Sequence, residues 1–366
     1  MKLSAFSLPL GRFKRISAVV LILFALATVV MLFTAAAADG DATQGSNFEN
    51  ELSPVKYTPV RIYEHPPSND RTYQIKIYPS THQHQAKNSL EAANSYHLGE
   101  ITGQRHGTVL ILTPLKNART VIKAYFNKLE TLTYPKHLIS IGLLISDSDD
   151  GTEEEVRRYI SRDLVPGFRR ITVICRDYQF QLKSNRRHEF QMQASRRSVM
   201  AQSRNYLVHQ TLEDEQWVLW IDSDLKSYPQ TLIGDLLSYN KSLLVPNCLW
   251  KTLFGQVYPY DRNSWQDTDA SLRMMAGLED DELVFEGYAL NTHRRALGDM
   301  LNKKEELVEL DGVGGTVLLV LADLHRDGLI FPVAPYKHTI ETEGLAQLAK
   351  DMGVRAYGLP HYRIFH

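Results

Sequence analysis

An uninterrupted apolar run, Trp217–Ile221, that leads straight into two carboxylates constrains this chain more than any other stretch. Bulky side chains at every position fit a strand that is buried on both faces, as in parallel sheets. Because side chains alternate along a strand, Asp222 and Asp224 can point the same way where the strand ends. Two hard oxygen ligands at the carboxyl end of a buried strand suit Mg²⁺ or Mn²⁺ bridging a phosphorylated ligand. A solvated turn is the alternative interpretation of the same Asp-Ser-Asp tripeptide.

The chain before this run alternates between strand and helix patterns. Strands are expected at 108–114, 138–145 and 170–174, with helices at 117–131 and 153–161. Such alternation favours right-handed crossovers and a parallel sheet. The prediction is therefore an α/β fold with a mostly parallel central sheet flanked by helices. No glycine-rich phosphate loop follows the first strand, which argues against dinucleotide and P-loop sites.

Further elements are expected on both sides of this core. After the acidic pair, the pattern predicts a short helix at 231–239, strands at 243–246 and 317–322, and a helix that begins near Tyr336. Residues 72–78 alternate like a short strand.

Length, net charge and cysteine count argue against several classes of protein. A chain of 366 residues is long enough for one large domain or two ordinary ones. The net charge of −1 gives no basic surface for nucleic acid. Cys175 and Cys248 are too few for a disulfide framework or a zinc site, so buried free thiols are expected. A single bridge between them stays open if the compartment is oxidising.

The amino-terminal segment predicts the membrane topology. Residues 16–38 carry no charge and are numerous enough to span a bilayer as a helix. Basic residues precede them and acidic residues follow, which places 1–15 in the cytosol and the rest in a lumen. A cleaved signal peptide is the alternative, but this apolar run is longer than typical signal sequences have. Residues 39–104 are polar and predict a luminal stem before a domain at 105–366.

A second carboxylate pair, Asp147-Ser-Asp149, shows how weak the tripeptide is as a signal. It is followed by Asp-Gly-Thr-Glu-Glu-Glu, which is typical of acidic residues at the first turn of a helix. Helix capping is the preferred interpretation, and a contact with ribose or base is the alternative.

An arginine-bearing helix is expected immediately before the Trp217 strand. Arg197 and Arg204 fall at helical spacing and share a face. Such arginines usually lie in a solvated surface. This helix leads directly to Asp222, however, and a guanidinium there could bind a diphosphate through paired hydrogen bonds. Arg204 and Asn205 are therefore candidate nucleotide contacts.

Later segments offer candidates for sugar binding and acid–base chemistry. Residues 258–265 combine aromatic faces with polar edges, as sugar-binding surfaces do, although a mixed surface loop fits equally well. Glu286 and Asp311 are carboxylates beside glycines, and Glu341 lies at the start of the expected last helix.

An ordered series of motifs resembles the fungal mannan polymerase subunits, glycosyltransferase family 62, over roughly residues 105–366. The motifs are Leu112-Thr-Pro-Leu-Lys116, Ala201-Gln-Ser-Arg-Asn-Tyr-Leu207, Trp217-Val-Leu-Trp-Ile-Asp-Ser-Asp224, Val245-Pro-Asn-Cys248, Glu309-Leu-Asp-Gly-Val-Gly-Gly-Thr316, Ile340-Glu-Thr-Glu-Gly344 and Gly358-Leu-Pro-His-Tyr362. The resemblance implies a GT-A fold, GDP-mannose as donor and Mn²⁺ or Mg²⁺ as cofactor. It also implies transfer with retention of configuration, and assembly with related subunits in the Golgi membrane.

The resemblance also implies roles for individual residues. Asp222 and Asp224 match the family's D-x-D metal motif. The final Phe-His matches its closing aromatic-His, so His366 is implied as a third metal ligand. Pro114 and Leu115 lie in the first motif, where the nucleotide is implied to bind. His338 and His361 are the alternative third ligands, and Asn117 stands where relatives often carry Asp.

The resemblance thus implies a mannosyltransferase that extends the α-1,6 backbone of N-linked mannan. A divalent ion on the acidic pair would neutralise the leaving diphosphate. Glu286, Asp311 and Glu341 are the candidates for orienting the acceptor mannose or stabilising the cationic sugar centre. A non-catalytic assembly subunit of the same complex is the alternative. A phosphatase with an aspartyl nucleophile is disfavoured, because Lys226 stands where that chemistry usually has a small or hydroxyl residue.

Overall fold

The computed structural model describes residues 61–63, 73–77, 107–161, 167–181, 189–288, 291–302 and 304–366. All of these belong to one compact unit, Tyr57–His366. The predicted cytosolic tail and membrane anchor at 1–38 lie outside the described residues. Among the helices that the structure does describe, none is both long and apolar enough to cross a bilayer.

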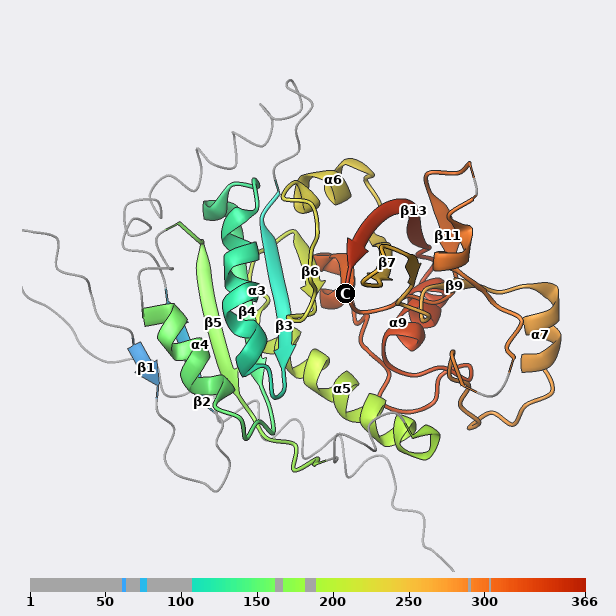
Figure 1. The fold of residues 1–366 in the computed structure, drawn as a ribbon. Coiled ribbons are helices and arrows are strands. Elements are labelled where there is room, and N and C mark those ends of the chain that lie inside the picture. Colours follow the sequence, from blue (N-terminus) through green and yellow to red (C-terminus); the bar gives the residue numbers. More distant parts are fainter. Residues whose placement is uncertain are drawn as a thin grey trace, which may run out of the picture. The chain divides into compact units, whose positions relative to one another are not determined.

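Parallel strands form one half of the central sheet (Figure 1). Strands β5 (Arg170–Cys175), β4 (Ile139–Ile145), β3 (Val109–Leu115) and β6 (Trp217–Ile221) lie side by side in that order and are all parallel. Their carboxyl ends therefore meet at one edge of the sheet, where ligands of open α/β sheets bind.

The other half of the sheet is mixed, so the prediction of a mostly parallel sheet is wrong there. Strand β12 (Val317–Leu321) is antiparallel to both of its neighbours, β6 and β7 (Leu243–Lys251). Strand β13 (Ala356–Phe365) then runs parallel to β7, and β11 (Val308–Leu310) runs antiparallel to β13. An apolar run shows that a strand is buried but not which way it points, and the direction depends on the connection before it.

Short strands extend or flank this sheet. Strands β1 (Arg61–Tyr63) and β2 (Tyr73–Ile77) fall within the expected stem, and β2 pairs antiparallel with β5. Strand β8 (Val257–Pro259) pairs with β7 to form a hairpin. Strands β9 (Trp265–Gln266) and β10 (Arg295–Ala296) form a separate small sheet.

Helices cover both faces of the large sheet and bury two apolar cores. Alternation along β3 sends Val109 and Ile111 to one face and Leu110 and Leu112 to the other. The first face packs against three helices, namely α3 (Arg119–Thr131), α4 (Thr152–Ser161) and α6 (Leu232–Ser238). The second packs against α5 (Phe190–Thr211), α8 (Ala322–Arg326) and α9 (Glu341–Asp351). The remaining described helices are α7 (Asp269–Met275) and the 3₁₀ turns η3 (Lys136–Leu138) and η5 (Leu297–Met300).

Two helices begin later than the sequence pattern predicts, and the backbone gives the reason. Asn117 has a left-handed φ of 50°, so α3 starts only at Arg119. Lys337 and His338 have φ values of 48° and 62° in a tight turn, so α9 starts at Glu341 rather than near Tyr336. These positive φ values keep Asn117, Lys337 and His338 out of the right-handed helices that follow them.

The two cysteines are buried free thiols. Cys175 lies on β5 and Cys248 on β7, in opposite halves of the sheet. The structure thus agrees with the expectation of unpaired cysteines.

Candidate active site

The acidic pair lies where β6 ends, at the carboxyl edge of the parallel strands. The Asp222 amide donates to the Thr316 carbonyl at 2.9 Å, which fastens the start of the loop to the residue before β12. The Asp222 side chain keeps 31% of its surface exposed and that of Asp224 keeps 50%. Both carboxylates can therefore meet a ligand from solvent.

The last residue of the chain is brought to this loop by β13. Phe365 pairs with Leu249 on β7, and its carbonyl accepts the Lys226 amide at 2.8 Å. His366 Nε2 then lies 3.2 Å from Asp224 Oδ1. The ring of Tyr260 stacks on His366 with centroids 3.8 Å apart. The terminal imidazole is therefore held beside the acidic pair by backbone pairing and by an aromatic neighbour.

Arg204 on α5 supplies the cation on the other side of Asp222. Its Nε donates to Glu341 Oε1 at 2.9 Å, and its Nη2 lies 3.6 Å from Asp222 Oδ1. The residue is 3% exposed, and Nη1 has no hydrogen-bond partner. A Cβ on Gly315 would lie 2.6 Å from Nη2, so any other residue there would displace this guanidinium. We call Asp222, Asp224, His366 and Arg204 the open acidic site.

Carboxylates dominate the electrostatics of this site. The pKa of Asp222 is raised to about 6, chiefly by burial and also by the nearby Asp224 and Glu341 charges, while Arg204 and His366 oppose the shift. Burial also raises the pKa of Asp261, which accepts hydrogen bonds from Ser264 and from the Asn263 amide. Crowded carboxylates of this kind are stabilised by a cation.

The residues present fit a divalent cation at an open rather than a closed site. Within the described part of the chain, no group of three or more His, Cys, Asp or Glu side chains is assembled as a metal cage. Asp224 and His366 contact each other, whereas Asp222 faces Arg204. Carboxylate oxygens plus one imidazole suit Mn²⁺, and phosphate oxygens of a ligand commonly complete such incomplete protein sites.

Glu341 is the one acceptor-side candidate that the structure places at this site. It is 3% exposed and anchors Arg204 beside Asp222. Its φ of 59° is unusual for a buried residue other than glycine. Such conformations cost on the order of 1–3 kcal/mol and persist where surrounding contacts enforce them, often at functional sites.

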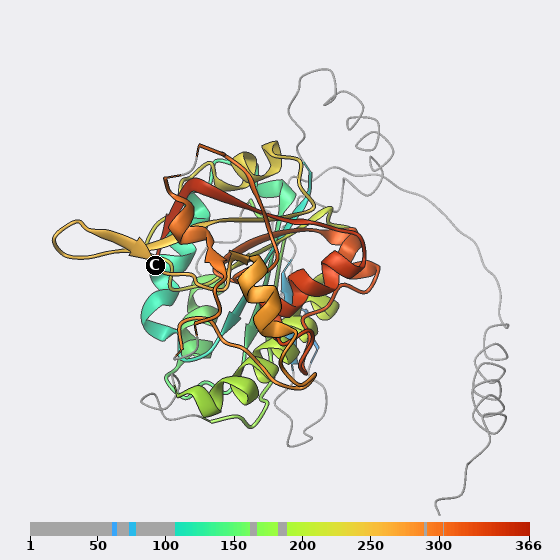
Figure 2. The same cartoon turned by 90° about the vertical axis from the view of Figure 1, so that its right-hand side faces the viewer.

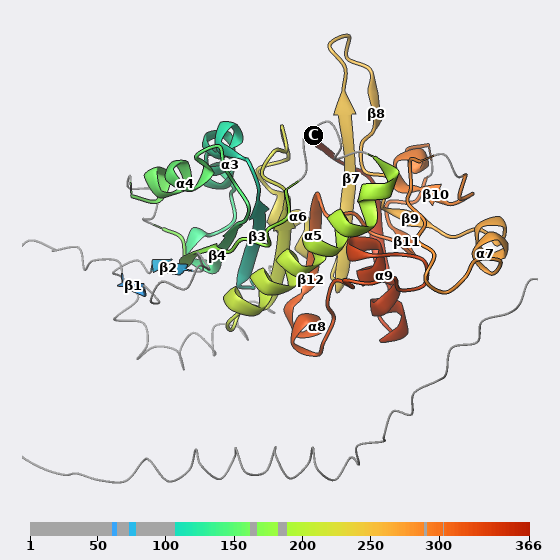
Figure 3. The same cartoon turned by 90° about the horizontal axis from the view of Figure 1, so that it is seen from below.

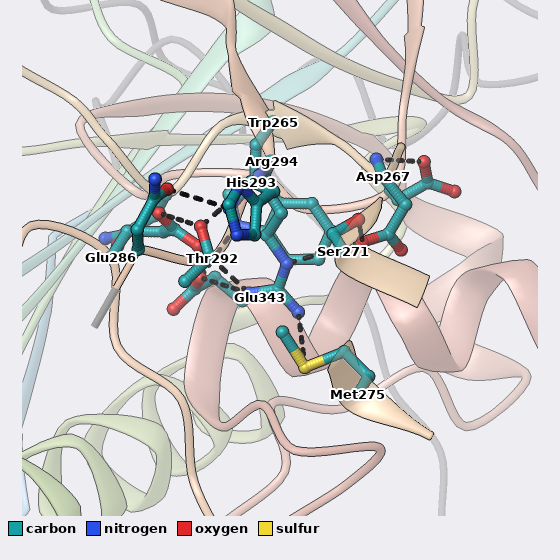
Figure 4. Close-up of polar contacts among 12 residues, drawn as sticks. Trp265, Asp267, Ser271, Met275, Glu286, Thr292, His293, Arg294 and Glu343 are labelled. Atoms are coloured by element: carbon teal, nitrogen blue, oxygen red, sulfur yellow. Dashed lines mark hydrogen bonds and ion pairs between the residues drawn. The ribbon is translucent and has the colours of Figure 1, made fainter. Parts of the chain in front are cut away.

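Glu286 belongs to a separate network, shown in Figure 4. Its carboxylate accepts hydrogen bonds from Arg294 at 3.2 Å and from Thr292 at 2.9 Å. Arg294 stacks 3.6 Å above Trp265, whose Nε1 donates to the fully buried Glu343 at 2.8 Å. Arg197 donates to the other oxygen of Glu343 at 2.5 Å. We call Arg197, Arg294, Glu343, Glu286 and Trp265 the closed arginine cluster.

Asp311 likewise has partners of its own. Its carboxylate accepts Lys350 Nζ at 2.7 Å and the Asp267 amide at 2.8 Å. The structure therefore gives Glu286 and Asp311 roles in holding loops together, and it does not bring their carboxylates to the acidic pair.

The three remaining candidate nucleotide contacts differ in their surroundings. Pro114 and Leu115 end β3, but the Leu115 side chain is 1% exposed and faces the apolar core. The Asn205 amide is held by both backbone groups of Phe331, at 2.8 Å each. Asn205 thus fastens α5 to the loop before α9 instead of facing the acidic pair.

Asp147 and Asp149 do not reproduce the open acidic site. The Asp147 carboxylate accepts the Tyr178 amide, and Asp149 donates its amide to Asn117. Asp150, next in the chain, accepts from the Thr152 amide and caps α4. Capping thus occurs in this segment, one residue later than the pair itself.

Residues 258–265, which include Tyr260 and Asp261, are a candidate sugar-binding segment from the sequence. The stacking of Tyr260 on His366 and the pairing of Glu343 with Arg197 were not predicted. The signal for Glu343 was present: Glu341 and Glu343 open α9, and α5 carries two arginines on one face, so two ion pairs could form between these helices. The usual assignment of a helix arginine run to the solvated surface is wrong here, because both arginines are buried.

Comparison with known proteins places the chain among named relatives. Residues 90–335 match the Anp1 family model. The chain is 36% identical to the mannan polymerase complex subunit MNN9 of Candida albicans, covering 81% of this chain and 83% of that protein. It is 40% identical to the mnn9 subunit of Schizosaccharomyces pombe, covering 70% of this chain and 79% of that protein. It is 33% identical to the mannan polymerase II complex ANP1 subunit of Saccharomyces cerevisiae, covering 72% of this chain and 55% of that protein.

Solved structures show only a loose likeness. A mannosyltransferase from Pyrobaculum calidifontis in complex with GDP-Man and Mn²⁺ gives a TM-score of 0.41 at 13% identity, over 71% of this chain and 57% of that one. GalNAc-T7 with UDP, GalNAc and Mn²⁺ gives a TM-score of 0.41 at 14% identity, over 72% of this chain and 43% of that one. A likeness of this size carries no inference about ligands.

Proposed function

Because the chain belongs to the Anp1 family, we propose that it is a metal-dependent, retaining mannosyltransferase of the GT-A type. It transfers mannose from GDP-mannose to an α-mannoside and extends the α-1,6 backbone of N-linked mannan. It does so as one subunit of a mannan polymerase complex with related subunits. The named relatives support the complex and the polymer.

The observation that carries the catalytic proposal is the meeting of Asp222, Asp224 and His366 at the carboxyl end of β6. These residues come from two distant parts of the chain and are held together by pairing between β13 and β7. They would hold Mn²⁺ or Mg²⁺, which when bound supplies charge neutralisation to the leaving diphosphate. An open edge with exposed carboxylates leaves room for that diphosphate.

Arg204 is placed to assist the same leaving group. Its Nη1 is a buried donor without a partner, and a buried unsatisfied donor is costly unless a ligand completes it. Glu341 fixes the guanidinium through Nε and so orients its remaining donors. A fixed guanidinium stabilises charge that develops on a phosphate oxygen without having to reorganise during the reaction.

Glu341 and Asp261 are the carboxylates near this site that could orient an acceptor or stabilise a cationic sugar centre. The Glu341 charge helps to raise the pKa of both Asp222 and Asp261, so Glu341 lies within electrostatic reach of both carboxylates. Among the sequence-derived candidates, Glu341 is therefore preferred over Glu286 and Asp311.

We extend the proposal to topology. Residues 16–38 anchor the chain as a single-pass type II protein of the Golgi membrane, with 1–15 in the cytosol. Residues 39–104 form a luminal stem, and 105–366 form the catalytic domain. Protease protection of microsomes with an amino-terminal tag tests this arrangement.

The test of the activity uses the full chain purified with its partner subunits. GDP-mannose binding and transfer to α-1,6-mannobiose are measured with and without Mn²⁺, against a panel of other sugar nucleotides. Metal-dependent transfer of mannose alone supports the proposal. Absence of both donor binding and transfer would contradict it.

A non-catalytic assembly subunit of the same complex is the second candidate, because the relatives are named as subunits of mannan polymerase complexes. Cells that carry Asp224→Asn separate the two. A catalytic subunit then yields shortened mannan although the complex assembles normally. An assembly subunit yields mannan of wild-type length.

A further inference from the structure

The β7–β8 hairpin projects from the body of the protein beside the chain's carboxyl-terminal end, as Figures 2 and 3 both show. Its two strands pair from Leu249–Pro259 to Lys251–Val257. The base of β7 pairs with β13, so the hairpin rises next to His366. A projecting ribbon this close to the open acidic site is positioned to meet a ligand that enters the site.

Aromatic rings lie along one face of this hairpin. Trp250 and Tyr258 are opposite each other in the ladder, and their rings stack with centroids 5.1 Å apart at 26°. Tyr260 follows Tyr258 by two residues, and its amide donates to the Cys248 carbonyl, which continues the pairing. Residues two apart on a strand share a face. Trp250 and Tyr258 therefore lie on the same face as Tyr260, and the three are here called the aromatic row.

The aromatic row is exposed and connects to the open acidic site. Trp250 is 40% exposed, and Tyr258 and Tyr260 are each 42% exposed. The row ends at the Tyr260–His366 stack, and His366 contacts Asp224. A ligand that lies along these rings therefore has one end beside the acidic pair.

We propose that the aromatic row is a binding subsite for the acceptor, an extended α-mannoside. The choice of ligand rests on the function proposed above. Pyranose rings present apolar C–H faces that pack on aromatic rings, and their hydroxyls bond the polar edges of tyrosines. The Tyr258 hydroxyl already donates to Gln256 in the same hairpin, so polar groups flank the stacked rings.

A sugar fits the row better than a protein partner does because of where the apolar side chains lie. The bulky aliphatic and phenyl groups of the hairpin, Leu253 and Phe254, are at its tip, 102% and 93% exposed. The rings that lead toward Asp224 instead carry hydroxyl and indole N–H groups. Amphipathic rings in a row suit a ligand with alternating apolar faces and hydroxyls.

The test compares Trp250→Ala and Tyr258→Ala with the matched control Phe254→Ala in the full chain with its partner subunits. We expect the KM for an α-1,6-mannotriose acceptor to rise about fivefold in the first two variants, since each aromatic contact is worth roughly 1 kcal/mol. The KM for GDP-mannose and kcat should stay near wild type. Phe254→Ala should leave both KM values unchanged.

Direct binding of mannotriose, followed by saturation-transfer NMR, separates this inference from the proposed function. If the wild type binds mannotriose through these rings but transfers no mannose, the proposed function fails and the subsite stands. If Trp250→Ala and Tyr258→Ala bind mannotriose as the wild type does, the subsite is overturned. If these two variants no longer bind the partner subunits but still bind mannotriose as the wild type does, the subsite is also overturned. The row is then a protein interface.

Discussion

The open acidic site and the closed arginine cluster both combine arginine with carboxylates, but only the closed cluster completes the pairing of its charges. In the closed cluster, Glu343 is fully buried and both of its oxygens are bonded, to Arg197 and to Trp265. In the open site, Asp222 and Asp224 are partly exposed, and Arg204 keeps a donor without a partner. Charged groups whose hydrogen-bond partners are all supplied by the protein stabilise the fold. Charged groups with a partner missing can bind a ligand.

Helices α5 and α9 connect the two regions. Arg204 pairs with Glu341 and Arg197 pairs with Glu343, so the same two helices contribute one ion pair to each. The closed cluster therefore fixes the helices that orient Arg204. If the closed cluster supports the fold and the open site the chemistry, substitutions in the two regions should separate stability from activity.

Glu343→Ala should have the largest effect, and it should act on stability. It leaves Arg197 and Arg294 as buried cations that have lost a counter-charge, which typically costs about 3–5 kcal/mol of the free energy of unfolding. Chemical denaturation of the purified chain measures this loss. A loss below about 1 kcal/mol would show that the cluster is not a stabilising element.

Asp224→Asn should act on activity alone. Removing one charged ligand from the open site should lower kcat/KM for mannose transfer by about 10²–10³-fold. The unfolding midpoint should not fall, because the side chain is half exposed and its charge adds to a crowd of carboxylates. The control is Asp323→Asn, an exposed carboxylate on α8. Equal activity in both variants would place the chemistry elsewhere.

A buried histidine, His325, should make the stability of the protein depend on pH. Burial lowers the pKa of His325 to about 4, although its bond to the Leu329 carbonyl opposes the shift. Between pH 6.5 and 4 the unfolded chain binds a proton that the folded chain does not, so stability falls as pH falls through this window. The loss is up to about 3 kcal/mol.

His325→Phe removes that proton-binding group. The difference in unfolding free energy between wild type and variant should therefore change with pH between 6.5 and 4 and be constant above 7. Parallel curves for the two proteins across the whole range would contradict the assignment.

The smallest effect is expected at an exposed ion pair that belongs to neither region. Arg157 and Glu153 pair one turn apart on α4 at 3.0 Å, with side chains 42% and 34% exposed. Arg157→Ala should cost at most about 0.5 kcal/mol, and salt should reduce even that. A calorimetric shift as large as that of Glu343→Ala would remove the contrast between closed and exposed pairs.

Much of the fold could be predicted from local patterns. The runs at β3, β4, β5 and β6 gave strands close to their observed bounds, and their connections through helices implied parallel neighbours. The direction of β12 could not be predicted, because Val317–Leu321 is equally apolar in either orientation. Its antiparallel place between β6 and β7 depends on chain segments far apart in sequence.

The candidate site residues show the same limit: their local placement could be predicted, but their partners could not. The sequence placed Asp222 and Asp224 at a strand end because burial and alternation are local properties. It could not tell that Glu286 and Asp311 are occupied by Arg294 and Lys350, since those partners come from other loops.

By itself, then, the sequence determined the strand that presents Asp222 and Asp224 and the family to which the chain belongs. Only the tertiary structure decided which charges are completed and which are left open. His366 meets Asp224 because β13 pairs with β7, and Arg204 faces Asp222 because Glu341 holds it. Periodicity reports burial within one segment, whereas the pairing of charges depends on which segments the fold brings together.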